Sequence, residues 1–327
     1  MNVKLVKWSS FAIPSVPVLV ALIIIFPLLP FWEYEQPSIF LDFDSVQNPE
    51  ISFEATTLEN GDNKIHGSAY YNDYLWFSTR TNPARVLKMN PDTLEYERVV
   101  LEGLNDGEDL IATQGKIWVI VYQSKTKIIT IDPETLSWTV AVELPFSRGG
   151  SLLYDFGYLW AGGNGRLARI NTTDYTYTVY GYPVNQFHAL SSGNGYLWGS
   201  SPNLFLSQTT ILKINPSNPQ EYSSVIIKKI VTDDMTYLDN ALYVGSETPG
   251  GESYIYKIYD NLTYIPVTTQ KRILCYGIFQ NDEFLWAAYT GNPGTIIQFS
   301  NKFELINVIQ LPNGYNDANE IIWDSNG

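Results

Sequence analysis

The 327-residue sequence has few of the residues that carry cross-links or nucleophilic chemistry: one cysteine, Cys275, and two histidines. A single cysteine excludes an internal disulfide, so packing alone must stabilise the fold, and we expect the thiol to be buried and unreactive. Paired-cysteine motifs, a GxSxG nucleophile elbow and a phosphate-binding glycine loop are absent. Lysine and arginine are scarce too, at 20 against 34 acidic residues, for a net charge of -14. This charge would repel phosphate backbones, so nucleic acid is not an expected partner.

Charged residues are missing from Trp8 to Trp32, a run with two lysines before it and two glutamates after it. A helix of this length can cross a hydrocarbon core of about 30 Å, and its positive flank places the N-terminus inside. We predict that residues 1–35 form a cytoplasmic N-tail and one transmembrane anchor at the cell membrane, and that residues 36–327 lie outside the cytoplasm. A cleaved secretory signal is the alternative, although PLLPFWEYE offers no small-x-small cleavage site. Four prolines in the run would also kink a helix.

What the sequence does contain is repeated: GYLWAGG at 157–163 returns as GYLWGSS at 195–201. An apolar-aromatic pair recurs with spacings of 42, 42, 38, 45 and 43 residues, at Leu75-Trp76, Ile117-Trp118, Leu159-Trp160, Leu197-Trp198, Leu242-Tyr243 and Leu285-Trp286. Tight-turn residues precede each pair, and two further alternating runs follow it, separated in several repeats by Asn-Pro or Asp-Pro. Four short strands per repeat, with no helical period, predict an all-β fold of the β-propeller type. The recurring aromatic residue is expected to pack between blades, with ligand stacking as the alternative.

The two ends of the chain predict a further blade. Residues 36–64 and 313–327 supply 29 and 15 positions, together about one repeat, and NEIIWDSNG resembles the opening strand and turn of a blade. We therefore predict a seven-bladed propeller with six complete blades and one shared by the termini, which would leave no exposed sheet edge between the ends. The alternative is that a longer native protein completes this blade.

The unit LWAGGNGRLARINTTDYTYTVYGYP resembles the repeats of streptogramin-lyase-like, NHL-type and two-component-sensor propellers, and the resemblance covers roughly residues 51–327. It implies the propeller architecture. In streptogramin lyases it further implies a histidine and glutamate cluster with a magnesium ion at the channel mouth, which drives elimination. This sequence departs from that pattern because no histidine follows His188. The family's expected general base is therefore missing, and its catalytic residues are not carried over.

The innermost strand of each predicted blade starts at the mouth of the central channel, nine residues before each apolar-aromatic pair. This position holds His66, Glu108, Gly150, His188, Asp233 and Tyr276, with Glu320 by extrapolation in the seventh blade and Arg148 two residues before Gly150. Imidazole and carboxylate groups suit a divalent cation, Mg²⁺ or Ca²⁺, or a cationic ligand. Alternatively, they satisfy loop backbone groups or face channel water. No other cofactor is indicated.

The segment GSSPNLFLSQTT, residues 199–210, is the longest predicted loop between second and third strands and should lie on the mouth face. Its Leu204, Phe205 and Leu206 indicate a contact patch for a protein partner, or they fold back onto the blade. Two sequons make Asn171 and Asn261 candidate glycosylation sites.

These features predict a membrane-anchored, extracytoplasmic propeller that acts as a binding or scaffold module for a protein partner or a small ligand, within a membrane complex or alone. The alternative is a metal-dependent lyase or hydrolase at the channel mouth, using His66, His188, Glu108 and Asp233. The residues that would catalyse such a reaction are not identified by the sequence.

Overall fold

The computed structural model describes residues 58, 59, 62, 64–247, 252–271, 274–280, 284–290, 294–300 and 305–310. Regular structure in these residues is entirely β-strand, arranged as six four-stranded antiparallel sheets. Each sheet uses four strands that are consecutive in the sequence, so neighbouring strands are joined by hairpins. The all-β prediction is confirmed for this part of the chain.

The first two sheets contain β1 (Ile65–Tyr71), β2 (Tyr74–Thr79), β3 (Ala84–Met89) and β4 (Tyr96–Leu101), then β5 (Gly107–Thr113), β6 (Lys116–Val121), β7 (Lys127–Ile131) and β8 (Trp138–Glu143). The third and fourth contain β9 (Ser151–Asp155), β10 (Tyr158–Gly163), β11 (Arg166–Ile170) and β12 (Tyr177–Gly181), then β13 (Ala189–Gly193), β14 (Tyr196–Asn203), β15 (Gln208–Ile214) and β16 (Tyr222–Lys228). The last two contain β17 (Val231–Leu238), β18 (Ala241–Glu247), β19 (Glu252–Tyr259) and β20 (Tyr264–Lys271), then β21 (Leu274–Gln280), β22 (Phe284–Thr290), β23 (Thr295–Ser300) and β24 (Leu305–Gln310).

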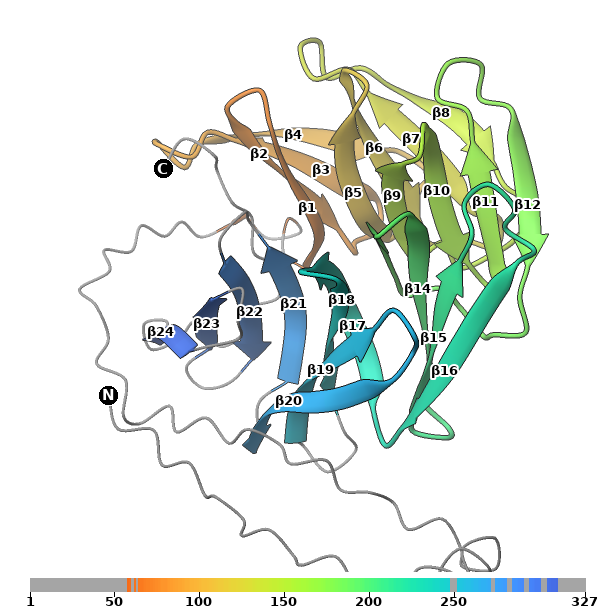
Figure 1. Ribbon diagram of the computed structural model, residues 1–327. Coiled ribbons are helices and arrows are strands. Elements are labelled where there is room, and N and C mark those ends of the chain that lie inside the picture. The colour runs from red at the N-terminus through yellow and green to blue at the C-terminus, as the bar shows by residue number, and fades with distance from the viewer. Residues whose placement is uncertain are drawn as a thin grey trace, which may run out of the picture. The chain divides into compact units, whose positions relative to one another are not determined.

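The sheets are arranged radially, as the blades of a β-propeller (Figure 1). The first strand of each sheet contacts the first strand of the next, from β1 to β5, β9, β13, β17 and β21 in turn. Between β21 and β1 the described residues make at most marginal contact. Six blades are therefore present in the described part of the chain. The predicted seventh blade, at residues 36–64 and 313–327, lies almost wholly outside it.

The predicted anchor at residues 8–32 also lies outside the described residues. Among the residues that are described, no helix has the length and apolar character needed to cross a membrane.

The recurring tryptophans fix the hairpin between the first and second strands of four blades. Trp76, Trp118, Trp160 and Trp198 are fully buried. Each indole Nε1 donates a hydrogen bond to the carbonyl of the last residue of the preceding strand, at 3.2 Å to Tyr71, 3.0 Å to Thr113, 3.1 Å to Asp155 and 3.4 Å to Gly193. Burial of a large ring is favourable only when its N–H keeps a partner, and the turn carbonyl supplies one. The predicted packing role is confirmed for these four residues.

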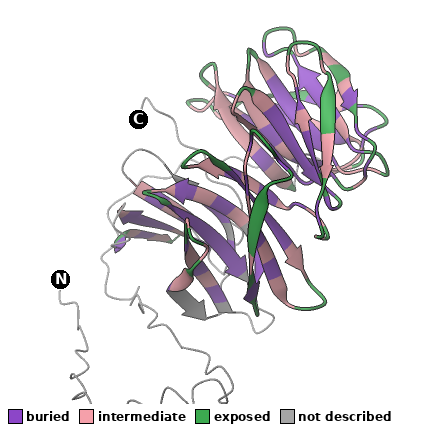
Figure 2. Ribbon diagram, turned by 45° about the vertical axis from the view of Figure 1, so that its right-hand side comes forward, coloured by how far each residue is buried: buried purple, intermediate pink, exposed green. Residues whose placement is uncertain are grey.

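Adjacent sheets share their apolar cores. In the first interface, Trp76 and Val99 of the first sheet cluster with Leu110 and Ile117 of the second. Figure 2 shows the result: buried residues run along the inner strands, and exposure increases toward the outer strands and hairpin tips. The outermost strand β16, for example, begins with three exposed residues.

The Asn-Pro and Asp-Pro breaks close the hairpin between third and fourth strands. The side-chain Oδ1 of each first residue accepts the backbone N–H two residues later, at Asn90 (2.8 Å), Asp132 (3.0 Å) and Asn215 (3.0 Å). Asn171 and Asn261 do the same at 2.9 and 3.1 Å, so both sequon asparagines cap turns. This geometry explains the recurrence of Asn and Asp at these sites without a functional role.

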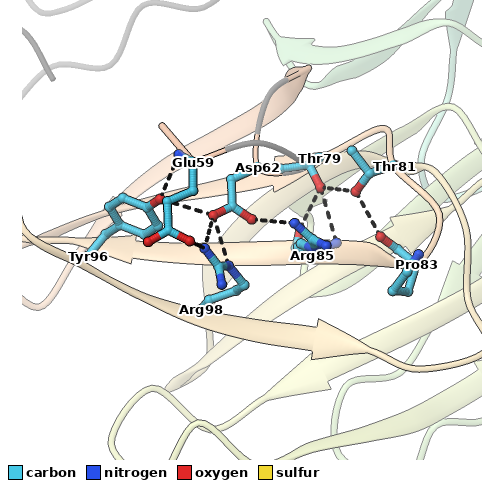
Figure 3. Close-up of polar contacts among 8 residues, drawn as sticks. All are labelled: Glu59, Asp62, Thr79, Thr81, Pro83, Arg85, Tyr96 and Arg98. Carbon is cyan, nitrogen blue, oxygen red and sulfur yellow. Dashed lines mark hydrogen bonds and ion pairs between the residues drawn. The ribbon is translucent and has the colours of Figure 1, made fainter. Parts of the chain in front are cut away.

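An ion-pair network holds the segment before β1 against the first sheet (Figure 3). Asp62 is fully buried; its Oδ1 accepts a 2.8 Å bond from Arg85 Nη1, and its Oδ2 is paired with Arg98. Tyr96 donates its hydroxyl to the same carboxylate at 3.0 Å, and Glu59 pairs with Arg98 at 2.6 Å. Because Asp62 is buried with two guanidinium partners, side-chain hydrogen bonds hold its pKa below the usual value despite the opposing effect of burial.

Candidate functional site

The inner strands begin at one end of the propeller, and most of them begin with a β-bulge. The pairing register shifts between Ile65 and Gly67, Gly107 and Asp109, Thr232 and Met235, and Cys275 and Gly277. The residues inside these bulges include His66, Glu108, Asp233 and Tyr276, which are the positions that the repeat phase selects. A bulge re-aims its side chain relative to the pleat. For His66 and Glu108, the bulges therefore distinguish these side chains from the packing residues of the same strands.

Two blades meet in a compact polar cluster at this mouth. His66 Nδ1 donates to the backbone carbonyl of Glu108 at 2.6 Å, and Arg80 Nε donates to Glu108 Oε1 at 2.9 Å. The Glu108 side chain is only 4% exposed, whereas His66 and Arg80 are 32% and 43% exposed. Arg80 follows directly after β2, which ends opposite Ile65, so the antiparallel register brings it to the mouth. Solvent thus reaches the imidazole and the guanidinium but scarcely reaches the carboxylate.

Burial sets the protonation of this cluster. It lowers the pKa of His66 to about 4, and the charges of Arg80 and His188 lower it further. The hydrogen bond to the Glu108 carbonyl raises the pKa, but by less than these effects lower it. Burial also raises the pKa of Glu108 to about 7, although Arg80 opposes the shift. At neutral pH His66 is therefore uncharged, and its 3.8 Å approach to Glu108 Oε2 is not an ion pair.

Two aspartates beside the predicted positions join neighbouring blades. Asp109 accepts backbone N–H bonds from Leu110 and from Leu152 of β9, both at 2.7 Å. Asp234 accepts the equivalent bonds from Met235 at 2.7 Å and from Ile278 of β21 at 2.9 Å. Each carboxylate thereby links the inner strand of its own blade to that of the next. In the sequence, Asp109 and Asp234 each follow another acidic residue directly, in Glu108-Asp109 and Asp233-Asp234. These tandem acids are the signal by which the two aspartates could have been found.

Burial raises the pKa of Asp109 to about 7 and that of Asp234 to about 6. The two backbone hydrogen bonds of each carboxylate oppose this shift, while the negative charges of Asp234 and Glu108 add to it at Asp109. Three inner-strand carboxyl groups therefore titrate near neutral pH.

The other predicted mouth residues are placed as follows. His188 directly precedes β13, and its backbone N–H donates to Ser200 O at 2.9 Å. Arg148 is exposed in the connection before β9, with a positive φ of 58°, and the described contacts do not join its side chain to the cluster. Asp233 lies in β17, but its side chain and the whole of Glu320 are outside the described residues. In the described part of the chain, no group of three or more His, Cys, Asp or Glu is placed to hold a metal ion.

The predicted loop at residues 199–210 is much shorter than expected, because residues 199–203 and 208–210 extend β14 and β15 as paired strands. Only residues 204–207 form the turn, and Leu204, Phe205 and Leu206 are 70%, 99% and 63% exposed. The alternative that they fold back onto the blade is wrong. Ala189 pairs with Ser200, so this hairpin tip points to the same end of the sheet as His188, which is the mouth face.

Comparison with known proteins shows the fold alone. No protein-family model and no curated protein matches the sequence. Among solved structures, the chain is similar to the WD40 repeats of RRP9, with a TM-score of 0.62 and 10% identity over 81% of this chain and 85% of that chain. It is also similar to a quinoprotein alcohol dehydrogenase-like protein of Bacteroides thetaiotaomicron, with a TM-score of 0.56 and 13% identity over 79% of this chain and 68% of the other.

A third similar structure is the extracellular domain of a hybrid two-component system of B. thetaiotaomicron, with a TM-score of 0.57 and 16% identity over 79% of this chain. The present chain covers only 36% of the length of that domain. All three are β-propeller likenesses at low identity, so they carry no information on ligand or chemistry.

The raised pKa of Asp109 predicts a specific pH dependence of stability. Between about pH 4 and pH 7 the folded chain keeps a proton on Asp109 that the unfolded chain has released, so the stability that this proton supplies is lost as the pH rises. In Asp109→Asn we expect the free energy of unfolding to fall less steeply over this window, by up to about 1.4 kcal/mol per pH unit. Urea titrations at pH 5 and pH 7.5 measure the difference, with Asp92→Asn on an exposed turn as the control. An unchanged slope in Asp109→Asn would contradict the raised pKa.

Proposed function

We propose that this protein is a membrane-anchored, extracytoplasmic β-propeller that binds a protein partner or a small ligand at its mouth face. The observation that carries the proposal is that the accessible functional groups lie on the mouth face. His66 and Arg80 are half-exposed at the mouth above a buried carboxylate, and the apolar tip at residues 204–206 projects from the same face. By contrast, the recurring Trp76, Trp118, Trp160 and Trp198 are fully buried in the packing between blades.

The alternative function, a metal-dependent lyase or hydrolase, is less well supported by this cluster. A lyase or hydrolase would need His66 or Glu108 to present a free lone pair to a metal ion or to a substrate proton. His66 can meet this requirement only at Nε2, because its Nδ1–H is donated to the Glu108 carbonyl. The Glu108 carboxylate is paired with Arg80 and is almost inaccessible, so this cluster offers one free lone pair and not a set of metal ligands. Polar recognition of a ligand needs only the edges of His66 and Arg80 that solvent already reaches.

Partner binding is tested by isolating the full chain from its native membranes in mild detergent. We expect a protein or small molecule that co-purifies with the wild type to be lost from His66→Asn and His188→Asn, because asparagine keeps a donor but removes the ring. Asp92→Asn, on the opposite face, serves as the control and should retain it. Mass spectrometry identifies the bound species. Equal recovery from all four proteins would place binding elsewhere than at the mouth.

The membrane location rests on the uncharged run from Trp8 to Trp32 and the lysines before it. Protease added to intact cells should therefore digest the propeller while a short N-terminal fragment stays with the membrane. An epitope tag at each end of the chain, followed by immunoblotting, distinguishes the two ends. Complete protection of the C-terminal tag in intact cells, with digestion after lysis, would refute the topology.

We further propose that the two ends of the chain complete a seventh blade against the first sheet. Trp76, Val86 and Val99 face the second sheet, so Leu87, whose position in β3 has the opposite parity, faces away from it. Leu87 is nevertheless fully buried, and Arg98, its partner across β3 and β4, holds Asp62 on that same face. Within the described residues, β5 is the strand of another sheet that contacts the first sheet extensively. A further blade would cover the face that the second sheet leaves open.

Closure by the C-terminal segment is tested with Ile321→Ala/Ile322→Ala. If these residues belong to a blade, loss of buried isoleucine costs about 2–5 kcal/mol, and the melting temperature falls by about 4 °C or more in a domain of this size. Ser325→Ala is the matched control, and circular dichroism follows unfolding. A melting temperature equal to that of the wild type would show that the segment adds nothing to the fold.

A further inference from the structure

Exposed charges are divided between the two faces of the propeller. On the mouth face, the described strand ends and connections carry the exposed cations Lys64, Arg80, Lys125, Arg148, Arg166, Lys228 and Lys229. Exposed acids at that end include Glu102 and Glu143, and Glu143 is paired with Lys125 at 2.7 Å. The mouth face is therefore far less acidic than a net charge of -14 suggests.

The opposite face has the reverse character. Its hairpin turns carry the exposed acids Asp73, Asp92, Glu95, Asp132, Glu134, Asp174, Glu221 and Asp239. The cations near this end are withdrawn onto aromatic rings: Lys213 Nζ lies 4.0 Å from the centroid of Tyr196, Lys88 Nζ 4.3 Å from that of Tyr74, and the Arg169 guanidinium 4.7 Å from that of Tyr158. An anionic surface would thus be repelled by one face and accepted by the other.

The apolar tip at residues 204–206 stands beside two of the mouth-face lysines. Asn203 pairs with Gln208 at the end of the hairpin, and Gln208 pairs with Lys228 at the end of β16. Lys228 and Lys229 are both exposed, so they flank the base of the tip while its three side chains project beyond them. Apolar side chains at the extremity and lysines behind them make the pattern by which interfacial segments enter a bilayer with anionic lipid.

The size and shape of the tip favour a bilayer over a protein. A specific protein interface buries roughly 1,200–2,000 Å² with matched shape, whereas three side chains on a four-residue turn offer a small fraction of that area. A bilayer needs no matching shape, because insertion depends on apolar area and on attraction between lysine and headgroups. Phe205, which is almost completely exposed, would be the deepest residue of such an insertion.

We propose that Leu204, Phe205 and Leu206 insert into the interfacial region of a lipid bilayer, with Lys228 and Lys229 contacting anionic headgroups. The inference rests on the proposed membrane-anchored location, and it adds a second attachment point on the propeller itself. Because the tip belongs to one blade, it tethers the propeller at one side of the mouth face. The mouth cluster of His66 and Arg80 then lies next to the membrane surface, where its partner or ligand would be met.

The test uses the full chain reconstituted in phosphatidylcholine vesicles, with and without phosphatidylglycerol. A nitroxide is attached at Ser207→Cys, which adjoins the tip and leaves its three apolar side chains intact; Cys275 is buried and should not react, as labelling of the unsubstituted chain will verify. We expect the label to be accessible to oxygen and protected from a polar relaxation agent. The same label at Asp92→Cys, on the acidic face, should remain aqueous in the same vesicles.

Three substitutions give the matched comparisons. Adding Phe205→Ser should weaken insertion at position 207 by about tenfold or more, because a buried Phe side chain is worth that much in apolar transfer. Lys228→Glu/Lys229→Glu should abolish the difference between the two lipid compositions, while Glu134→Lys on the opposite face should not.

A label at position 207 that stays aqueous while the chain floats with the vesicles would overturn the inference and leave the anchor intact. Failure of the chain to float after a high-salt wash would instead refute the proposed anchor. Protection that appears only when a partner protein is added would assign the tip to protein binding and would also overturn the proposal.

Discussion

The interface between neighbouring blades is the constraint on which the rest of this structure depends. A four-stranded sheet cannot bury both of its faces alone, so each blade relies on the apolar side chains of the next. The recurring tryptophan serves this interface twice, because its ring fills the core and its Nε1 holds the hairpin that sets the register of the inner strand. Once that register is fixed, the beginning of every inner strand is delivered to the same end of the propeller.

This dependence explains why the fold was readable from the sequence. Packing between repeats demands similar residues at equal phase, so the Leu-Trp pairs and the Asn-Pro turns recur and can be counted. The same phase located His66, Glu108 and His188 near the mouth, since position along an inner strand follows directly from the repeat. Chain ends are different, because each holds less than one repeat, so the seventh blade inferred from them stays a prediction.

The polar cluster was less predictable because its geometry is not periodic. Arg80 comes from the end of a second strand and has no counterpart in the repeat, so only the register of β1 and β2 shows that it reaches Glu108. Asp109 and Asp234 were overlooked for a different reason: each lies one residue beyond the phase position, at a bulge that the alternation of a regular strand does not reveal. Likewise, the predicted loop at residues 199–210 is longer than the observed turn at 204–207, because pairing with β15 keeps residues 199–203 in a strand.

Burial and the division of exposed charge together make the mouth face less acidic than the composition of the whole chain indicates. Three inner-strand carboxyl groups have pKa values raised to about 6 or 7, and His66 is neutral, so the inner strands carry less charge than their residues imply. Most exposed acids of the described hairpin turns are on the other face, where solvation costs nothing. A propeller arranged in this way can approach a negatively charged surface only with its mouth side, and the exposed tip lies on that side. The division of exposed charge between the two faces therefore determines which face can approach an anionic surface.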